Sequence, residues 1–80
     1  MTENNFAEWL KAFMIENQIT TKDLADMIGS SERLIRHWRS GNCQPRFFSG
    51  IYIIKALSRL SNKSESEIYA QISAAVLKDN

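Results

Sequence analysis

Residues 19–41, ITTKDLADMIGSSERLIRHWRSG, decide the fold of this chain. Within them, Thr20 is a preferred N-cap residue. The carboxylate of Asp23, three positions later, can accept a hydrogen bond from the backbone N–H of Thr20, an arrangement close to a capping box. An acidic side chain also suits the positive N-terminal end of a helix. Because Gly29 can take the left-handed backbone conformation that ends a helix, the segment predicts a short helix over residues 21–28.

A second short helix is predicted directly after that glycine, over residues 32–40. Ser31 is its expected N-cap, and Gly41 closes it. The following stretch, up to Pro45, has the composition of a turn. Apolar residues at helical spacing give each of the two short helices one buried face. On the first helix they are Leu24, Ala25 and Ile28, and on the second Ile35 and Trp38, with Leu34 at the edge.

Three further helices are predicted around this pair. Apolar spacing predicts two of them over about residues 4–17 and 47–60, and Ser64 with Glu67 forms a capping box for a last helix over about 65–78. No alternating run is long enough for a strand, so the chain is predicted to be an all-α domain of five helices spanning residues 1–80. The residues expected to face inward are Phe6, Trp9, Leu10, Phe13 and Met14; Phe47 or Phe48, Ile51, Ile54 and Leu57, with Ile53 and Leu60 on an adjoining strip; and Ile68, Ile72, Ala75 and Val76.

Charge is distributed unevenly along the chain, although the formal net charge is only +1. Residues 1–30 carry −3 and residues 64–80 carry −2, whereas residues 31–63 carry +6. A local positive potential attracts nucleic acid, and a merely solvated basic surface is the alternative explanation. Glu32 is the one acidic residue of the middle segment. Its seven basic residues are Arg33, Arg36, Arg39, Arg46, Lys55, Arg59 and Lys63.

A longer pattern joins these elements: Leu-Ala, then an aliphatic residue and Gly, then Ser, Ile, Trp and Gly, followed by Pro and an apolar helix. Its positions are residues 19–31, Ile35, Trp38, Gly41 and Pro45. The pattern resembles the Cro/phage-repressor (Xre-type) helix-turn-helix family over about residues 6–72. That resemblance implies a lambda-repressor-like DNA-binding domain, in which the second helix crosses the DNA backbone and the third enters the major groove.

The resemblance places base-reading side chains at the start of the third helix, at Glu32, Arg33, Arg36 and His37. Arg33 or Arg36 can donate two parallel hydrogen bonds to guanine O6 and N7. A carboxylate that faces phosphates is electrostatically unfavourable unless another interaction compensates for the repulsion. Glu32 therefore either pairs with Arg36 at i, i+4 and holds its guanidinium, or accepts a hydrogen bond from cytosine N4. Ser31–Arg33 and Arg36–Trp38 are also similar to small phage regulators, including those encoded beside anti-CRISPR genes.

Phosphate contacts are expected from the start of the second helix, from both ends of the third, and from the loop that follows it. Thr21 matches a position at which the family places a phosphate-contacting Gln, and Arg46 is the strongest candidate in the loop. A chain of this length is marginal alone, so a homodimer is expected through the helix over about 65–78, with the end of the preceding helix as a further contributor. The phosphate-binding candidates are Thr21, Lys22, Ser31, Ser40, Asn42, Gln44 and Arg46. The dimer candidates are Ile68, Tyr69, Ile72, Val76 and Leu77.

The expected function is that of a sequence-specific, double-stranded DNA-binding transcriptional regulator, an autoregulating repressor that reads a palindromic operator. The alternative is a protein-interaction module of the same fold, an antitoxin or antirepressor acting through a second protein. An enzyme is not expected, because no triad, carboxylate pair or phosphate-cradling glycine loop is visible.

No cofactor and no metal are expected, because His37 is the sole histidine and the single cysteine, Cys43, lies in a turn. One cysteine fits a reducing compartment, and the absence of a signal pattern and of a long apolar run excludes export and a membrane partner. The expected location is therefore the cytoplasm or nucleoid of a bacterium, or of a phage-infected host cell.

Overall fold

Five helices make up the part of the chain that the computed structural model describes, which is residues 5–41, 45 and 47–77, with side chains for 6–41, 45 and 50–75. They are α1 (Asn5–Glu16), α2 (Thr21–Ile28), α3 (Glu32–Ser40), α4 (Phe47–Ser61) and α5 (Glu65–Leu77). Since these residues contain no strand, the all-α prediction is confirmed. No helix among them has the length and apolar character needed to cross a bilayer.

Local capping fixes where α2 begins and ends. The hydroxyl oxygen of Thr20 accepts a hydrogen bond from the backbone N–H of Asp23 at 3.0 Å, and the Asp23 carboxylate accepts one from the backbone N–H of Thr20 at 3.1 Å. This is the reciprocal capping box that the sequence predicts. At the other end Gly29 is left-handed, with φ of 69°, and the next residue, Ser30, donates its N–H to the carbonyl of Ala25.

The capping box predicts a pH dependence of folding. Hydrogen bonds from the Thr20 backbone N–H lower the pKa of Asp23 below its ordinary value of 3.8. A group with a depressed folded-state pKa stabilises the fold above its unfolded value, and that contribution is lost as the pH falls through the lower folded value. We therefore expect Asp23→Ala to melt below the wild type at neutral pH, with the gap closing below pH 3.8, as measured by circular dichroism. An equal gap at all pH values would contradict this assignment.

The other predicted caps also form. The hydroxyl oxygen of Ser31 accepts the N–H of Leu34 at 3.2 Å at the start of α3. Gly41 ends α3 with φ of 85°. The Ser64 hydroxyl oxygen accepts the N–H of Glu67 at 3.1 Å at the start of α5, which is one of the two bonds of the predicted capping box. Because every one of these bonds spans only a few residues, the ends of the helices follow from the local sequence.

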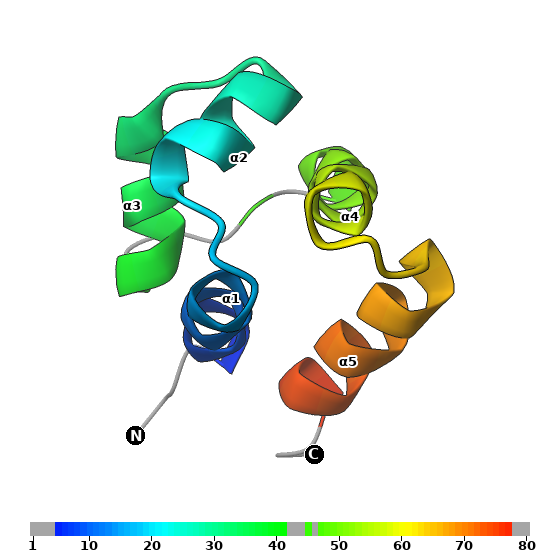
Figure 1. Cartoon of the computed structure of the whole chain (residues 1–80). Helices are drawn as coiled ribbons and strands as arrows, with labels where there is room; N and C mark the ends of the chain where they lie inside the picture. Colours follow the sequence, from blue (N-terminus) through cyan, green and yellow to red (C-terminus); the bar gives the residue numbers. More distant parts are fainter. Residues whose placement is uncertain (1–4, 42–44, 46, 78–80) are drawn as a thin grey trace.

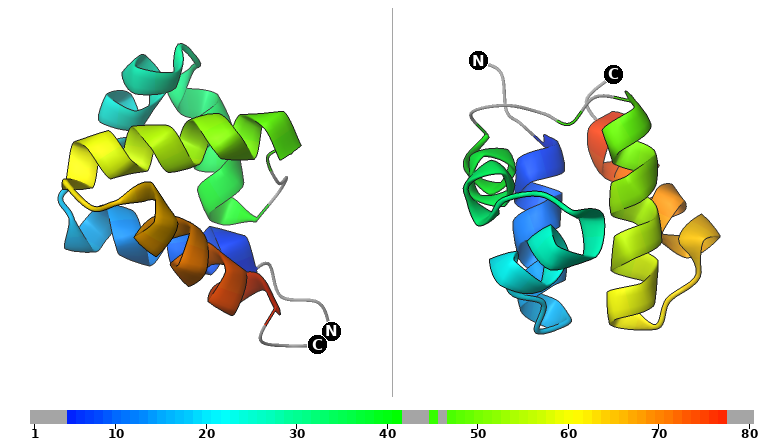
Figure 2. Two further views of the ribbon diagram at one scale, coloured as in Figure 1. Left: turned by 90° about the vertical axis from the view of Figure 1, so that its right-hand side faces the viewer. Right: turned by 90° about the horizontal axis from the view of Figure 1, so that it is seen from above.

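All five helices contribute to one core, and the connection between α1 and α2 adds Ile19. α2 packs against both α3 and α4, and α5 packs against α4 and α1 (Figure 1). Figure 2 shows α2 on one side of α4 and α5 on the other. Most of the predicted inward residues of α1, α2 and α3 are buried, and Trp9, Ile28 and Leu34 are partly buried against them. The residues with the least exposure are Leu10, Met14, Leu24, Ile35, Ile53, Leu57 and Ile68.

The prediction of which face of α4 is buried is wrong, because the buried face is rotated around the helix from the predicted one. Ile51 was expected in the core but is 39% exposed, whereas Ile53, expected on the adjoining strip, is completely buried. Ala56 and Leu57 lie beside Ile53 in the core, and Ile54 is only partly buried. The buried stripe thus centres on Ile53, and the Ile51 side of α4 faces outward.

The position of α5 also corrects one expectation about dimerisation. Ile68 is completely buried within the chain's own core, and Ile72 is partly buried against it. The indole N–H of Trp9 on α1 donates a hydrogen bond to the side-chain oxygen of Gln71 at 3.2 Å, which ties the same face of α5 to α1. Ile68 therefore has no surface to offer a second copy. Tyr69, the next residue along α5, points away from the core and is 62% exposed.

Candidate nucleic-acid interface

The pair α2 and α3 forms a unit with one buried face and one open face. Ile35 and Trp38 turn one side of α3 into the core, with exposures of 0% and 3%. Leu24 and Ala25 do the same for α2. Since α3 takes its contacts from α1 and α2, its remaining side looks away from the bundle (Figure 1).

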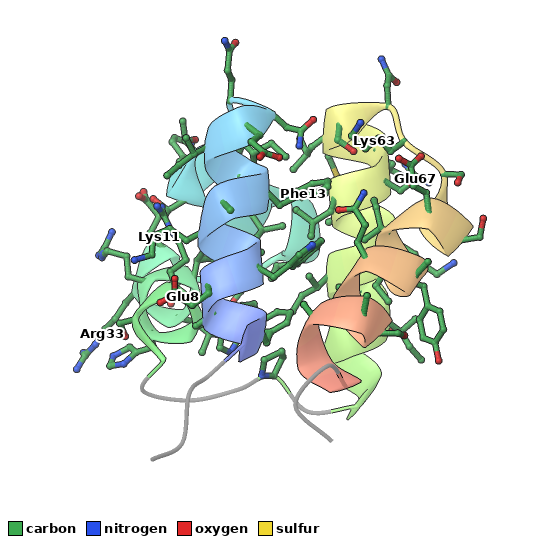
Figure 3. All side chains as sticks on the ribbon, turned by 90° about the horizontal axis from the view of Figure 1, so that it is seen from below. Glu8, Lys11, Phe13, Arg33, Lys63 and Glu67 are labelled. Atoms are coloured by element: carbon green, nitrogen blue, oxygen red, sulfur yellow. The ribbon has the colours of Figure 1, made fainter. Side chains whose placement is uncertain are left out.

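Basic side chains occupy the outer side of α3. They line a shallow hollow of about 230 Å³ together with His37 and Ser40. The Arg33 side chain is exposed and projects away from the helices (Figure 3). The Arg36 side chain is 62% exposed, whereas His37 is partly buried. Two guanidinium groups one turn apart, both open to solvent, supply the planar donors that match guanine edges or phosphates.

Glu32 links the two helices of the unit. Its Oε1 atom accepts a hydrogen bond from the hydroxyl of Thr21, at the start of α2, at 3.0 Å. The same oxygen lies 3.6 Å from Nη1 of Arg36, one turn further along α3. The carboxylate is thus held from one side by α2 and faces the guanidinium on the other. This geometry favours the pairing role for Glu32 over direct acceptance from a cytosine.

The three hydroxyl groups predicted to bind phosphate differ in whether the hydroxyl proton is already used in a hydrogen bond within the chain. Thr21 already donates to Glu32, and Ser40 donates to the carbonyl of His37 at 3.0 Å. Ser31 uses its oxygen as an acceptor in the α3 cap, so its hydroxyl proton remains available. A phosphate at Thr21 or Ser40 would have to displace an internal bond, and Ser31 is therefore the better donor of the three.

Lys22 is engaged within α2. Its ammonium lies 2.7 Å from the Asp26 carboxylate in an exposed i, i+4 pair. The hydrogen bond to Asp26 raises the pKa of Lys22 above its ordinary value. Its charge is therefore partly offset, which makes it a weaker phosphate ligand than its sequence position suggests. The remaining phosphate candidates, Asn42, Gln44 and Arg46, lie outside the described residues.

A second hollow, of about 290 Å³, lies between α4 and α5 and bears on the dimer candidates. It is lined by Ile51, Ile54, Glu65, Ser66 and Tyr69. Tyr69 is thus the one dimer candidate that the structure places on an open apolar surface, and Ile51 joins it there. The side chains of the candidates Val76 and Leu77 lie outside the described set.

Sequence reasoning missed two features of these surfaces. The contact between Thr21 and Glu32 joins residues eleven positions apart and depends on how α2 and α3 pack, which no local pattern encodes. The exposure of Ile51 was missed because Ala56 is a weak apolar signal. Counting it would have given the stripe Ile53, Ala56, Leu57 and Leu60, with the spacing i, i+3, i+4 and i+7.

The open side of α3 presents the guanidinium groups of Arg33 and Arg36, the partly buried imidazole of His37 and the hydroxyl of Ser40. The Glu32 carboxylate lies beside them, held by its hydrogen bond from Thr21. This side of α3 suits recognition of a polar, anionic surface better than catalysis, since the hollow is shallow and formed largely by one helix. No protein-family model, curated protein or solved structure matches the chain.

Proposed function

We propose that this chain is a sequence-specific, double-stranded DNA-binding transcriptional regulator of the Cro/phage-repressor (Xre-type) kind, an autoregulating repressor that acts in the cytoplasm. In this proposal α3 enters the major groove, α2 crosses the phosphate backbone, and Arg33 and Arg36 read base edges. The chain acts by binding and carries out no catalysis. As an autoregulating repressor, the protein would set the occupancy of its operator by its own concentration.

The observation that carries the proposal is the exposure of the two arginines on the side of α3 that faces away from the core. The core contacts of α3 come from Ile35 and Trp38, so its two solvent-facing guanidinium groups are accessible to an anionic partner. A major groove about 12 Å wide admits one helix with its side chains. The short α2–α3 turn at Gly29 supports the same arrangement, since Ser31, Glu32 and Arg33 at the start of α3 are exposed.

We further propose that the chain binds DNA as a two-fold dimer through the hollow between α4 and α5. Ile51 and Tyr69, which are 39% and 62% exposed, would be covered by the equivalent surface of a second copy. Two third helices related in this way read half-sites whose centres lie about 34–36 Å apart. The operator is accordingly expected to be a palindrome.

The direct test is selection of binding sites from a random pool of duplex DNA by the purified chain. An enriched motif with two inverted half-sites, about one helical turn apart, is the expected result. A pool that shows no enrichment over several rounds, while the protein still binds duplexes in proportion to its charge, would reject sequence-specific recognition.

The role of the Glu32 carboxylate can be tested by a single substitution. Replacing Glu32 by Gln keeps an acceptor for Thr21 but removes the charge that faces Arg36. We expect stronger binding to non-specific duplex, because a negative charge leaves the phosphate-facing side, and a loss of operator discrimination of up to about fivefold, the value of an exposed ion pair. Fluorescence anisotropy on both duplexes measures the ratio.

Asp26→Asn is the matched control for Glu32→Gln, because it removes one exposed carboxylate of α2, paired with Lys22, without touching α3. It should leave discrimination unchanged. If Glu32→Gln instead relaxed the preference at a single C·G pair and nowhere else, Glu32 would be a base reader and the pairing role would be wrong.

The second candidate function is a protein-interaction module, an antitoxin or antirepressor of the same fold. The observation that favours it is an apolar surface outside the core, since Met27 and Tyr52 are 43% and 65% exposed. The two functions are compatible, because these side chains lie on α2 and α4 whereas the proposed base-reading residues lie on α3.

A further inference from the structure

A third hollow, of about 300 Å³, lies between the end of α2 and the outer side of α4. It is lined by Met27, Ile28, Tyr52, Lys55, Ala56 and Arg59. Its apolar part is open to solvent, since Met27 and Tyr52 are both among the most exposed large apolar side chains of the described residues. Exposed apolar side chains gathered in one place, with polar residues at the rim, are the usual mark of an interaction surface.

The rim of this hollow is positively charged. Lys55 and Arg59 stand one turn apart on α4, a helix that contains no acidic residue. The ammonium of Lys55 lies 3.9 Å from Glu65 of α5, whereas the Arg59 guanidinium forms no ion pair within the part of the chain that is described. The carboxylate next to Met27, that of Asp26, is already paired with Lys22 at 2.7 Å. The hollow therefore combines an apolar floor with a positively charged rim, in which Arg59 has no acidic partner among the described residues.

This surface is separate from the other two. Its lining residues include none of those that line the α3 hollow or the α4–α5 hollow among the described positions. α2 packs against both α3 and α4, and α4 also packs against α5, where Lys55 at the rim of this hollow lies 3.9 Å from Glu65 of the α4–α5 hollow. A ligand seated here would leave the outer side of α3 open.

We infer that the α2–α4 hollow binds an acidic amphipathic helical segment of another protein. An apolar side chain of that segment packs between Met27 and Tyr52, and carboxylates on its flanks pair with Arg59 and Lys55. Duplex DNA is a poorer occupant, because phosphates gain nothing from covering the apolar surface of Met27 and of the Tyr52 ring. A second copy that docked here through the proposed α4–α5 dimer surface is also disfavoured, since that surface brings mainly apolar groups and a Glu65 already paired with Lys55. The inference does not depend on DNA binding.

The test uses the whole chain without DNA and a short synthetic helical peptide with leucines and phenylalanine on one face and glutamates on the other. Nuclear magnetic resonance titration should shift the Met27 methyl and the Tyr52 ring signals. The same peptide with lysines in place of glutamates should not bind. Arg59→Glu should weaken binding about fivefold or more, since an attraction becomes a repulsion. Lys11→Glu, the same charge change on exposed α1, should leave it unchanged.

Three results of the titration would overturn the inference. They are an absence of shifts at Met27 and Tyr52, shifts confined to the arginines of α3, and equal binding of the acidic and basic peptides. Self-association of the chain that Arg59→Glu abolishes would also overturn it, because the occupant would then be a second copy. Folding of each variant is checked by its melting curve, since Arg59 is exposed and its replacement should leave the core intact.

Discussion

The Arg36→Ala variant is expected to bind the selected operator about 5- to 150-fold more weakly than the wild type, the range spanned by one bidentate contact to guanine. Binding to non-specific duplex should change far less, because that affinity depends on total charge. Arg33→Ala is expected to behave in the same way. The measurement is the ratio of specific to non-specific dissociation constants at one salt concentration.

The same experiment separates base reading from phosphate contact. If either arginine only touched phosphate, its removal would lower affinity equally on all sequences and reduce the salt slope by about one. Lys63→Ala is the control, since Lys63 lies at the opposite end of the molecule from Arg33 in Figure 3. It should leave the ratio unchanged. Both arginines are exposed, so melting curves within about 0.5 kcal/mol of the wild type would show that the loss is not unfolding.

Much of the architecture could be predicted because helix ends are decided locally. Thr20 with Asp23 and the glycine at 29 act over three to five residues, and each does in the structure what the sequence indicates. Helix α1 could be placed for a similar reason. Its apolar residues repeat with one clear period, and the left-handed Gln18, with φ of 56°, ends the helix where Asn17 and Gln18 interrupt that pattern.

The orientation of α4 could not be predicted in the same way. Apolar residues occur on most sides of this helix, so periodicity alone does not choose which side packs on α2 and α5. Tertiary packing decides it, and it chooses Ile53 over Ile51. The same limit applies to Ile68, whose place in a helical stripe is compatible with a core and with a dimer interface alike.

At the candidate site, the sequence predicts that the two arginines are exposed, but it does not predict the hydrogen bonds of the residues around them. Arg33 and Arg36 fall opposite Ile35 and Trp38 on a helical wheel, and burial of the latter pair leaves the former exposed. The Thr21 hydroxyl could not be assigned to Glu32 in advance, because that bond depends on the crossing of α2 and α3. As a result, the Thr21 hydroxyl, which was expected to donate to phosphate, donates to Glu32 instead.

The matched pair Ile53→Ala and Ile51→Ala should separate folding from assembly. Ile53 is fully buried, so its truncation removes apolar contacts and leaves a cavity, at a cost of about 2–5 kcal/mol in the free energy of unfolding. For a domain of this size that lowers the melting temperature by at least about 8 °C. The same truncation at the exposed Ile51 should change the stability of the monomer by no more than about 0.5 kcal/mol.

Ile51→Ala should instead weaken the dimer. Ile51 lines the α4–α5 hollow with Tyr69, so a second copy seated there would lose apolar contact, and sedimentation should report a larger dissociation constant. A substitution is a cleaner test than removal of α5, because truncation would take Ile68 out of the core and unfold the chain. The melting curves are recorded at low protein concentration, since dimerisation itself raises the apparent stability. If Ile51→Ala left self-association intact while Ile53→Ala still destabilised the fold, the packing of α4 would stand and the dimer would have to form elsewhere.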